Sequence, residues 1–254
     1  CINLLAITLL ICGGYGVKYI FDQKRDVEEA RIRQHELLAS EQKHAKEALE
    51  NLQKQKQQEQ LEKNKKNTYR DFDKLKKQNP DTVAWLTVPG TEIDTAIVKT
   101  DDNVYYLTHN FDKKYNSLGW PFADYNNSFP ELNTNTIIYG HTYKRSTSFS
   151  TLKDVLEKSW LKNKEKQKIT LDTEKERLTF EVFSVYTLEE TNDYLYISFK
   201  SNDKYQKYLN KSIKRSIKNF NNKPTTNNKI LTLSTCYQDS NHRLVVQAKL
   251  IDSK

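Results

Sequence analysis

The stretch "ILTLSTCYQDSNHRLVVQAKLI", residues 230–251, decides the fold at the C-terminal end of the chain. Two runs rich in aliphatic and β-branched residues flank a polar segment, residues 237–242, which is typical of a β-hairpin. Side chains alternate between the two faces of a strand, so Cys236 lies on the more polar face of the first run. If the two strands pair symmetrically about the polar segment, Cys236 and Arg243 lie directly opposite each other.

This pairing predicts a reactive thiol. Directly opposed residues hold their Cβ atoms about 4.5–5.5 Å apart, and a guanidinium at that distance favours the thiolate, which is the nucleophilic form of cysteine. The same guanidinium can donate hydrogen bonds to an oxyanion. Cys236 is the only cysteine after residue 12, so the chain beyond that point can form no internal disulfide. A lone cysteine can also be a small, inert, buried hydrophobe, and this alternative stays open.

The region before the hairpin contains many short strand-like runs and few helices. Runs of strand character lie at residues 83–98, around a Pro-Gly turn, and at 135–140, 168–172 and 178–188. A short helix is expected at 68–78, because Asn79-Pro80 ends it. A longer amphipathic helix is expected at 202–220, with a core-facing stripe formed by Tyr205, Leu209, Ile213, Ile217 and Phe220. The pattern predicts a mainly β fold, a barrel or a sandwich with helical insertions.

The N-terminal third of the chain differs in composition from the rest. Residues 1–21 are mostly apolar and suit the length of a transmembrane anchor. A cleaved signal peptide is the alternative, but its apolar core is usually shorter and no small-residue cleavage site is obvious here. Residues 22–67 hold eleven basic and ten acidic residues without Gly or Pro, which predicts a solvated helical stalk rather than a coiled coil. The globular domain is expected at 68–254. The charges that flank the anchor leave the side of the membrane open.

A nucleophilic cysteine usually works with a nearby acid or base, and one of the five histidines stands out. Residues 68–254 contain only three glycines, and one of them, Gly140, directly precedes His141 at the end of a strand-like run. A glycine in that place suggests a backbone bend or a close approach. His35 and His44 lie in the stalk, and a surface or core-edge position suits His109. Alternation turns His242 to the face away from Arg243 or places it in the loop.

Three motifs together resemble the sortases, the membrane-anchored cysteine transpeptidases of Gram-positive bacteria. They are "TLSTC" at 232–236, Arg243 at the start of the next strand, and "IIYGH" at 137–141, which places the histidine 95 residues before the cysteine. The segment "TYRDFDKLKKQNPDTVAWLTVPGTEID" and the helix near 202–220 resemble class B members. The short segment between Cys236 and Arg243 is more similar to the pilus-type class C.

The resemblance implies an eight-stranded sortase-type β-barrel with an N-terminal helix and a long helix before the last two strands. It implies a single-pass membrane protein with an extracellular catalytic domain. Cys236 would be the nucleophile, His141 the general acid and Arg243 the stabiliser of the oxyanion, while Thr235, Ser234 and Tyr139 would line the substrate groove. The enzyme would cleave surface proteins after the Thr of a C-terminal sorting motif and transfer them, through a thioester, to an amine of a cell-wall precursor or a pilin.

The sequence also bears on other partners, cofactors and functions. The net charge is +8, but the lysines are scattered among acids without interleaved aromatics, so we expect no nucleic-acid partner. No acidic cluster has the spacing of a calcium site, and we expect no metal and no other cofactor. Two alternatives remain: a membrane-tethered cysteine hydrolase that cuts peptidoglycan peptides, and a non-enzymatic wall-binding domain. Papain-like hydrolases place the cysteine before the histidine, which is the reverse of the order here.

Overall fold

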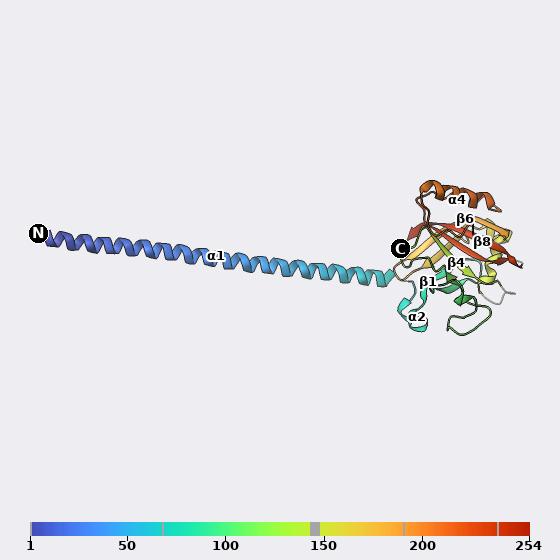
Figure 1. The fold of residues 1–254 in the computed structure, drawn as a ribbon, viewed down its shortest axis with the longest axis horizontal. Coiled ribbons are helices and arrows are strands. Elements are labelled where there is room, and N and C mark those ends of the chain that lie inside the picture. Colours follow the sequence, from blue (N-terminus) through green and yellow to red (C-terminus); the bar gives the residue numbers. More distant parts are fainter. Residues whose placement is uncertain (1, 68, 143–147, 190, 238) are drawn as a thin grey trace. The chain divides into compact units, whose positions relative to one another are not determined.

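The computed structural model describes residues 2–67, 69–142, 148–189, 191–237 and 239–254. Side chains are not described at 1–20, 60–68, 143–148, 190 and 236–240. The chain divides into two compact units, Cys1–Glu62 and Lys63–Lys254 (Figure 1), and each is considered by itself.

The first unit lies within one long helix, α1, Ile2–Asn67. Its described side chains are almost all exposed, and ion pairs between neighbouring turns, such as Arg33 with Glu36 at 3.2 Å, support the helix. Among the described residues, no helix has the length and apolarity needed to cross a bilayer. The anchor prediction rests on side chains that lie outside the described residues, so it stays a prediction.

The second unit is a closed eight-stranded β-barrel, which confirms the predicted fold class. Its strands are β1 Thr82–Thr87, β2 Asp94–Val98, β3 Phe122–Ala123, β4 Asn135–Gly140, β5 Lys168–Asp172, β6 Arg177–Glu189, β7 Ile230–Tyr237 and β8 Asp239–Ser253. They follow one another around the barrel in the order β1-β2-β3-β4-β7-β8-β6-β5. The helices are α2 Phe72–Gln78, α3 Lys158–Lys162 and α4 Asn202–Arg215, with 3-10 turns η1 Tyr105–Leu107 and η2 Ser148–Leu156.

The predicted C-terminal hairpin forms, but the connection between its two strands is shorter than expected. β7 and β8 are antiparallel, and their register places Cys236 opposite Arg243. Tyr237 already pairs with Asp239, so most of the expected six-residue loop belongs to the strands. The register shift between Cys236 and Tyr237 absorbs the difference.

The core has two layers on either side of the hairpin. Leu231, Leu233 and Val246 pack inside the barrel with the apolar residues of the other strands. On the outside, α4 covers β6 and β8 (Figure 1), and its Tyr205 and Leu209 pack in a second cluster of buried residues. Both faces of the hairpin are therefore buried, although only one of them is apolar.

The helix predicted at 202–220 ends earlier, at Arg215. After it, the hydroxyl of Ser216 accepts a hydrogen bond from the Val185 amide at 3.1 Å, and the Ile217 amide donates to the Val185 carbonyl at 2.8 Å. The chain leaves the helix because it pairs with β6 next to a bulge between Val182 and Ser184. The expectation that Ile217 belongs to the buried stripe is wrong, since 52% of its surface is exposed.

The sequence interpretation missed β3, η2 and α3. These elements are short, and their apolar residues show no long periodic pattern. Two of their side chains nevertheless belong to the main hydrophobic core: Phe149 and Trp160 are almost completely buried. The indole of Trp160 donates to the Pro89 carbonyl at 2.8 Å, which fastens α3 to the predicted Pro-Gly turn.

The polar face of the hairpin is satisfied by a buried hydrogen-bond network beneath α4. The Tyr208 hydroxyl of α4 accepts from the side-chain amides of Gln247 at 2.7 Å and Asn135 at 3.3 Å, and it donates to the Tyr194 carbonyl at 2.9 Å. Asn135 in turn accepts from the Thr232 hydroxyl at 2.8 Å. One hydroxyl thus joins α4, β4, β8 and the segment that connects β6 to α4.

We predict that Tyr208→Phe lowers the free energy of unfolding by about 1–3 kcal/mol, because it leaves two buried amide donors without their acceptor. Tyr205→Phe is the matched control, since that hydroxyl makes one bond, to the Asn228 carbonyl at 2.7 Å. Its expected loss is about 1 kcal/mol. Urea denaturation of both variants measures the difference, and equal losses would contradict the importance given to the Tyr208 hydroxyl.

Candidate active site

The site is built where two parallel strands end. β4 and β7 are neighbours in the barrel and run parallel, with Tyr139 beside Ser234 and Gly140 beside Thr235. The carboxyl ends of parallel neighbours meet at the same edge of a sheet. His141, one residue beyond β4, therefore comes to the same barrel edge as Cys236, near the end of β7.

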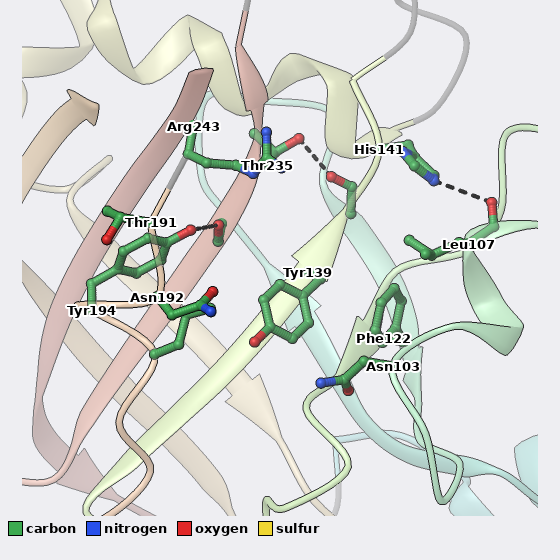
Figure 2. Close-up of a pocket in the computed structure, with 13 residues that line it drawn as sticks. Asn103, Leu107, Phe122, Tyr139, His141, Thr191, Asn192, Tyr194, Thr235 and Arg243 are labelled. Atoms are coloured by element: carbon green, nitrogen blue, oxygen red, sulfur yellow. Dashed lines mark hydrogen bonds between the residues drawn. The ribbon is translucent and has the colours of Figure 1, made fainter. Parts of the chain in front are cut away.

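A cavity of about 370 Å³ opens at this edge (Figure 2). The side chains of His141, Arg243, Tyr139, Ser234 and Thr235 all line it. Five of the six residues predicted for the site are therefore brought to one cavity. The sixth, Cys236, is paired with Arg243 through its backbone, and its side chain lies outside the described residues.

Arg243 reaches the cavity from the first half of β8. The strand lies between β7 and β6, and Arg243 pairs with Cys236 on one side and with Leu188 on the other. Its Nη1 donates to the His242 carbonyl at 3.2 Å. A permanently charged guanidinium fixed in a strand at the mouth of a cavity is well placed to interact with a developing oxyanion.

His141 is held from the opposite side of the cavity by the chain around η1. Its Nε2 lies 3.1 Å from the Leu107 carbonyl oxygen (Figure 2). Because a carbonyl only accepts hydrogen bonds, Nε2 carries a proton, and in the neutral ring Nδ1 is then the basic nitrogen. A backbone carbonyl in this position orients the ring as a carboxylate does in other histidine-dependent sites.

At Gly140 the backbone of β4 lies very close to a neighbouring side chain, as the glycine predicted. A Cβ at this residue would lie 2.3 Å from Cγ of Phe149, and Phe149 is completely buried. The ring of Phe149 thus occupies the space that a side chain at position 140 would need. The glycine lets β4 pass close to η2 just before His141.

The three residues predicted to line the groove each have a defined partner within the protein. The hydroxyl of Ser234 lies 2.8 Å from the Tyr194 hydroxyl, and that of Thr235 donates to the Gly140 carbonyl at 2.6 Å. The Tyr139 hydroxyl donates to the Asp124 carboxylate at 2.8 Å. Burial, and secondarily the charge of Asp124, raise the pKa of Tyr139 above its ordinary value, so the phenol stays protonated.

Loops supply the remaining walls, and sequence reasoning did not find them. Asn103, Leu107, Thr191, Asn192 and Leu195 line the cavity from the connections around η1 and between β6 and α4. Asn103 is fixed by its side-chain amide, which donates to Asp124 at 3.0 Å. These residues stand in irregular segments without periodicity, so the only available signal was the polar Asn and Thr content of the loops.

The other two histidines of this unit do not line the cavity. His109 stacks on Tyr105, with 4.1 Å between the ring centroids, and its Nδ1 lies 2.8 Å from the Tyr105 carbonyl. His242 pairs with Glu189 in the sheet between β8 and β6. His242 thus belongs to β8 and not to a loop, next to Arg243 and so on the opposite face of the strand.

Comparison with known proteins identifies the class. The sortase domain family matches residues 86–251. Sortase B of Listeria monocytogenes is 36% identical over 182 residues, which cover 70% of this chain and 72% of the relative. Among solved structures, the Staphylococcus aureus sortase B–substrate complex is 32% identical, with a TM-score of 0.68, over 80% of this chain and 94% of the other. A structure of sortase B complexed with triglycine has a TM-score of 0.67 and 31% identity over 71% of this chain and 85% of the other.

The chain belongs to the sortase family. It is an enzyme, a cysteine transpeptidase, and its similarity to sortase B confirms the class predicted from the N-terminal helix and strands. The hydrolase and wall-binding alternatives are thereby set aside.

Gly119 lies against the Leu107 carbonyl, which is the group that contacts His141. Gly119 has a φ of +60°, and a Cβ there would lie 2.3 Å from the Tyr106 carbonyl oxygen and 2.7 Å from that of Leu107. We predict that Gly119→Ala displaces the Leu107 carbonyl and shifts the imidazole resonances of His141 in NMR spectra.

Gly90→Ala is the matched control for this change. Gly90 also has a positive φ, +80°, but its Cβ would meet side chains, Lys166 at 2.7 Å and Trp160 at 3.1 Å, and not the carbonyl that contacts His141. Each variant is expected to lose about 1–3 kcal/mol of stability from the left-handed backbone. Unchanged His141 resonances in Gly119→Ala would show that the carbonyl does not hold the ring.

Proposed function

We propose that Cys236 is the nucleophile of this sortase, that His141 is its general acid and base, and that Arg243 stabilises the oxyanion. The observation that carries the proposal is the convergence of His141 and Arg243 on one cavity, at the barrel edge where Cys236 lies near the end of β7 opposite Arg243. The register favours a thiolate at Cys236, because the guanidinium is its cross-strand neighbour.

The reaction follows from these positions in two halves. The Cys236 thiolate attacks the carbonyl carbon of the sorting-motif Thr, and Arg243 donates hydrogen bonds to the oxyanion that forms. The carbon–nitrogen bond then breaks, the leaving amine takes a proton from His141, and a thioester remains. An acceptor amine attacks the thioester and loses a proton to His141, which releases the new amide and restores the thiolate.

The substrates are inferred from the same cavity and from relatives. A solved sortase B holds a substrate and another holds triglycine, which supports a sorting peptide as donor and an amine-ended chain as acceptor here. We assign the acceptor to a cell-wall precursor or a pilin. Ser234, Thr235 and Tyr139 line the cavity with polar groups, and they are proposed to position the donor peptide.

The location of the enzyme is part of the proposal. Residues 1–21 would form a single membrane-spanning anchor, residues 22–67 a helical stalk, and residues 68–254 an extracellular catalytic domain. The predominantly apolar sequence at 2–21 supports the anchor.

The roles of the three residues predict distinct losses of activity. With sorting peptides of the Asn-Pro-x-Thr-Asn, Leu-Pro-x-Thr-Gly and Ser-Pro-x-Thr-Gly types and an added amine, Cys236→Ala should form no exchanged product. His141→Ala should lower kcat by about 10²–10⁴-fold, and Arg243→Ala by about 10²–10³-fold. Mass spectrometry of the amide-exchanged peptide measures these rates.

His109→Ala is the control, since this histidine lies outside the cavity and should leave the rate within a factor of about two. Circular dichroism must show the same secondary structure in all variants. Full activity of Cys236→Ala, or equal losses in His109→Ala and His141→Ala, would contradict the assignment.

The anchor is tested separately. We predict that the full chain stays in the membrane fraction after alkaline carbonate extraction, whereas a variant with Leu9→Lys and Leu10→Lys is released, because charges near the centre of a span oppose insertion. Release of the unchanged chain would contradict the anchor and leave the catalytic assignment unaffected.

A further inference from the structure

A second cavity, of about 420 Å³, lies outside the barrel against α4. Four lysines and several aromatic rings line it, and the residues that matter here are Lys200, Lys204, Lys207, Lys211, Tyr196 and Phe199. We call it the basic pocket. It is as large as the catalytic cavity, and none of the residues assigned to catalysis lines it.

The positive charge of the basic pocket is mostly unbalanced. Asp193 is the acidic residue in its lining, but this carboxylate accepts hydrogen bonds from Nη1 and Nη2 of Arg215, each at 2.7 Å, and from Nζ of Lys211 at 2.7 Å. Within the described part of the chain, no acidic side chain lies within ion-pair distance of Lys200, Lys204 or Lys207. Three cations therefore remain available to a ligand.

One of these lysines, Lys204, is placed against the preference of the helix, although Asp203 in the same turn and four residues before Lys207 offsets part of the charge. Lys204 lies in the first turn of α4, whose N-cap is Ser201, and a cation there opposes the helix dipole. Lys204, Lys207 and Lys211 are three and four residues apart, so like charges face each other along one side of α4. Departures from local preference are found at functional or strained sites, and a row of lysines along one side of the pocket favours a bound anion.

The aromatic lining of the basic pocket adds a second kind of contact. Phe199 stacks on Tyr205 with 4.5 Å between ring centroids and packs on Tyr208 at 4.9 Å. Tyr196 meets Tyr208 edge to face at 6.2 Å and is 52% exposed. A half-exposed aromatic ring beside stacked rings offers an apolar surface for the flat face of a ligand.

We propose that the basic pocket binds an anionic oligosaccharide, with its acidic groups on Lys200, Lys204 and Lys207 and a sugar ring against Tyr196 and Phe199. Sugar rings have an apolar face of C–H groups that suits an aromatic lining. A single-stranded nucleic acid needs a groove that follows its backbone over several nucleotides, whereas these lysines surround one pocket. The single pocket with an aromatic lining therefore favours a carboxylated or phosphorylated glycan over a nucleic acid.

The basic pocket and the catalytic cavity share one wall. The segment between β6 and α4 turns Thr191, Asn192 and Leu195 toward the catalytic cavity and Asp193 and Tyr196 toward the basic pocket. A glycan held at the basic pocket is thus fixed beside the active site without occupying it. The binding proposal itself does not depend on the catalytic roles assigned above.

Isothermal titration calorimetry of the full chain in detergent tests the proposal, with a galacturonate tetrasaccharide as the anionic probe and maltotetraose as the neutral one. The galacturonate should bind and maltotetraose should bind at least about tenfold more weakly, since two lost ionic contacts amount to about one decade or more in Kd. The double variant Lys204→Gln/Lys207→Gln should weaken galacturonate binding by at least about tenfold.

Lys158→Gln/Lys162→Gln on α3 is the matched control, because it removes the same charge from two exposed lysines four residues apart. It should leave the Kd unchanged. Tyr196→Ser should also weaken binding, and Tyr196→Phe should restore it, because the ring face and not the hydroxyl makes the contact.

Several results would overturn the proposal. They are no heat of binding with galacturonate at millimolar concentration, equal binding of both sugars, equal effects of the α4 and α3 variants, and stronger binding of an oligothymidylate or an acidic peptide than of the galacturonate. Peptide-exchange activity that persists in Lys204→Gln/Lys207→Gln would show that the variant is folded.

Discussion

The parallel pairing of β4 with β7 is the constraint on which the active site depends. It joins strands that lie 95 residues apart and sets Gly140 beside Thr235, so that His141, which follows β4, and Cys236, near the end of β7, meet at one barrel edge. The last residue pair of this ladder requires a glycine at position 140, because the ring of Phe149 fills the space that a side chain would need. A shift of one residue in this register would turn every side chain of the shifted strand to the other face and would separate His141 from the end of β7.

The network beneath α4 explains how the hairpin can bury a polar face. Tyr208 satisfies Gln247 and Asn135, and Thr232 bonds Asn135, so the buried groups are not left without partners. The same network ties the segment between β6 and α4 to the barrel through the Tyr194 carbonyl. That segment is a wall of both cavities, so the stability of the barrel and the shape of the active site rest on shared hydrogen bonds.

Irregular segments complete the site, and each is held by few contacts. The carbonyl of Leu107 orients His141, Gly119 leaves room for that carbonyl, and Asp124 fixes both Asn103 and Tyr139. Strands thus position the groups proposed to react, while loops shape the surface that meets the substrate. Such a division allows one barrel to accept different peptides when its loops change.

The sequence by itself determined the hairpin, its register and the polar face shared by Cys236 and Arg243, because strand alternation and a short connection are local properties. It also predicted the mainly β class and most strands. Local patterns drew attention to His141, which follows Gly140, but could not show that it lies near Cys236. Its role was assigned by resemblance to a family, because only the parallel pairing of distant strands brings the two residues to one edge. The end of α4 at Arg215, the buried turn around Trp160 and the loop walls of both cavities were decided by tertiary packing, which overrides weak local periodicity when a residue such as Ser216 finds a better partner in β6.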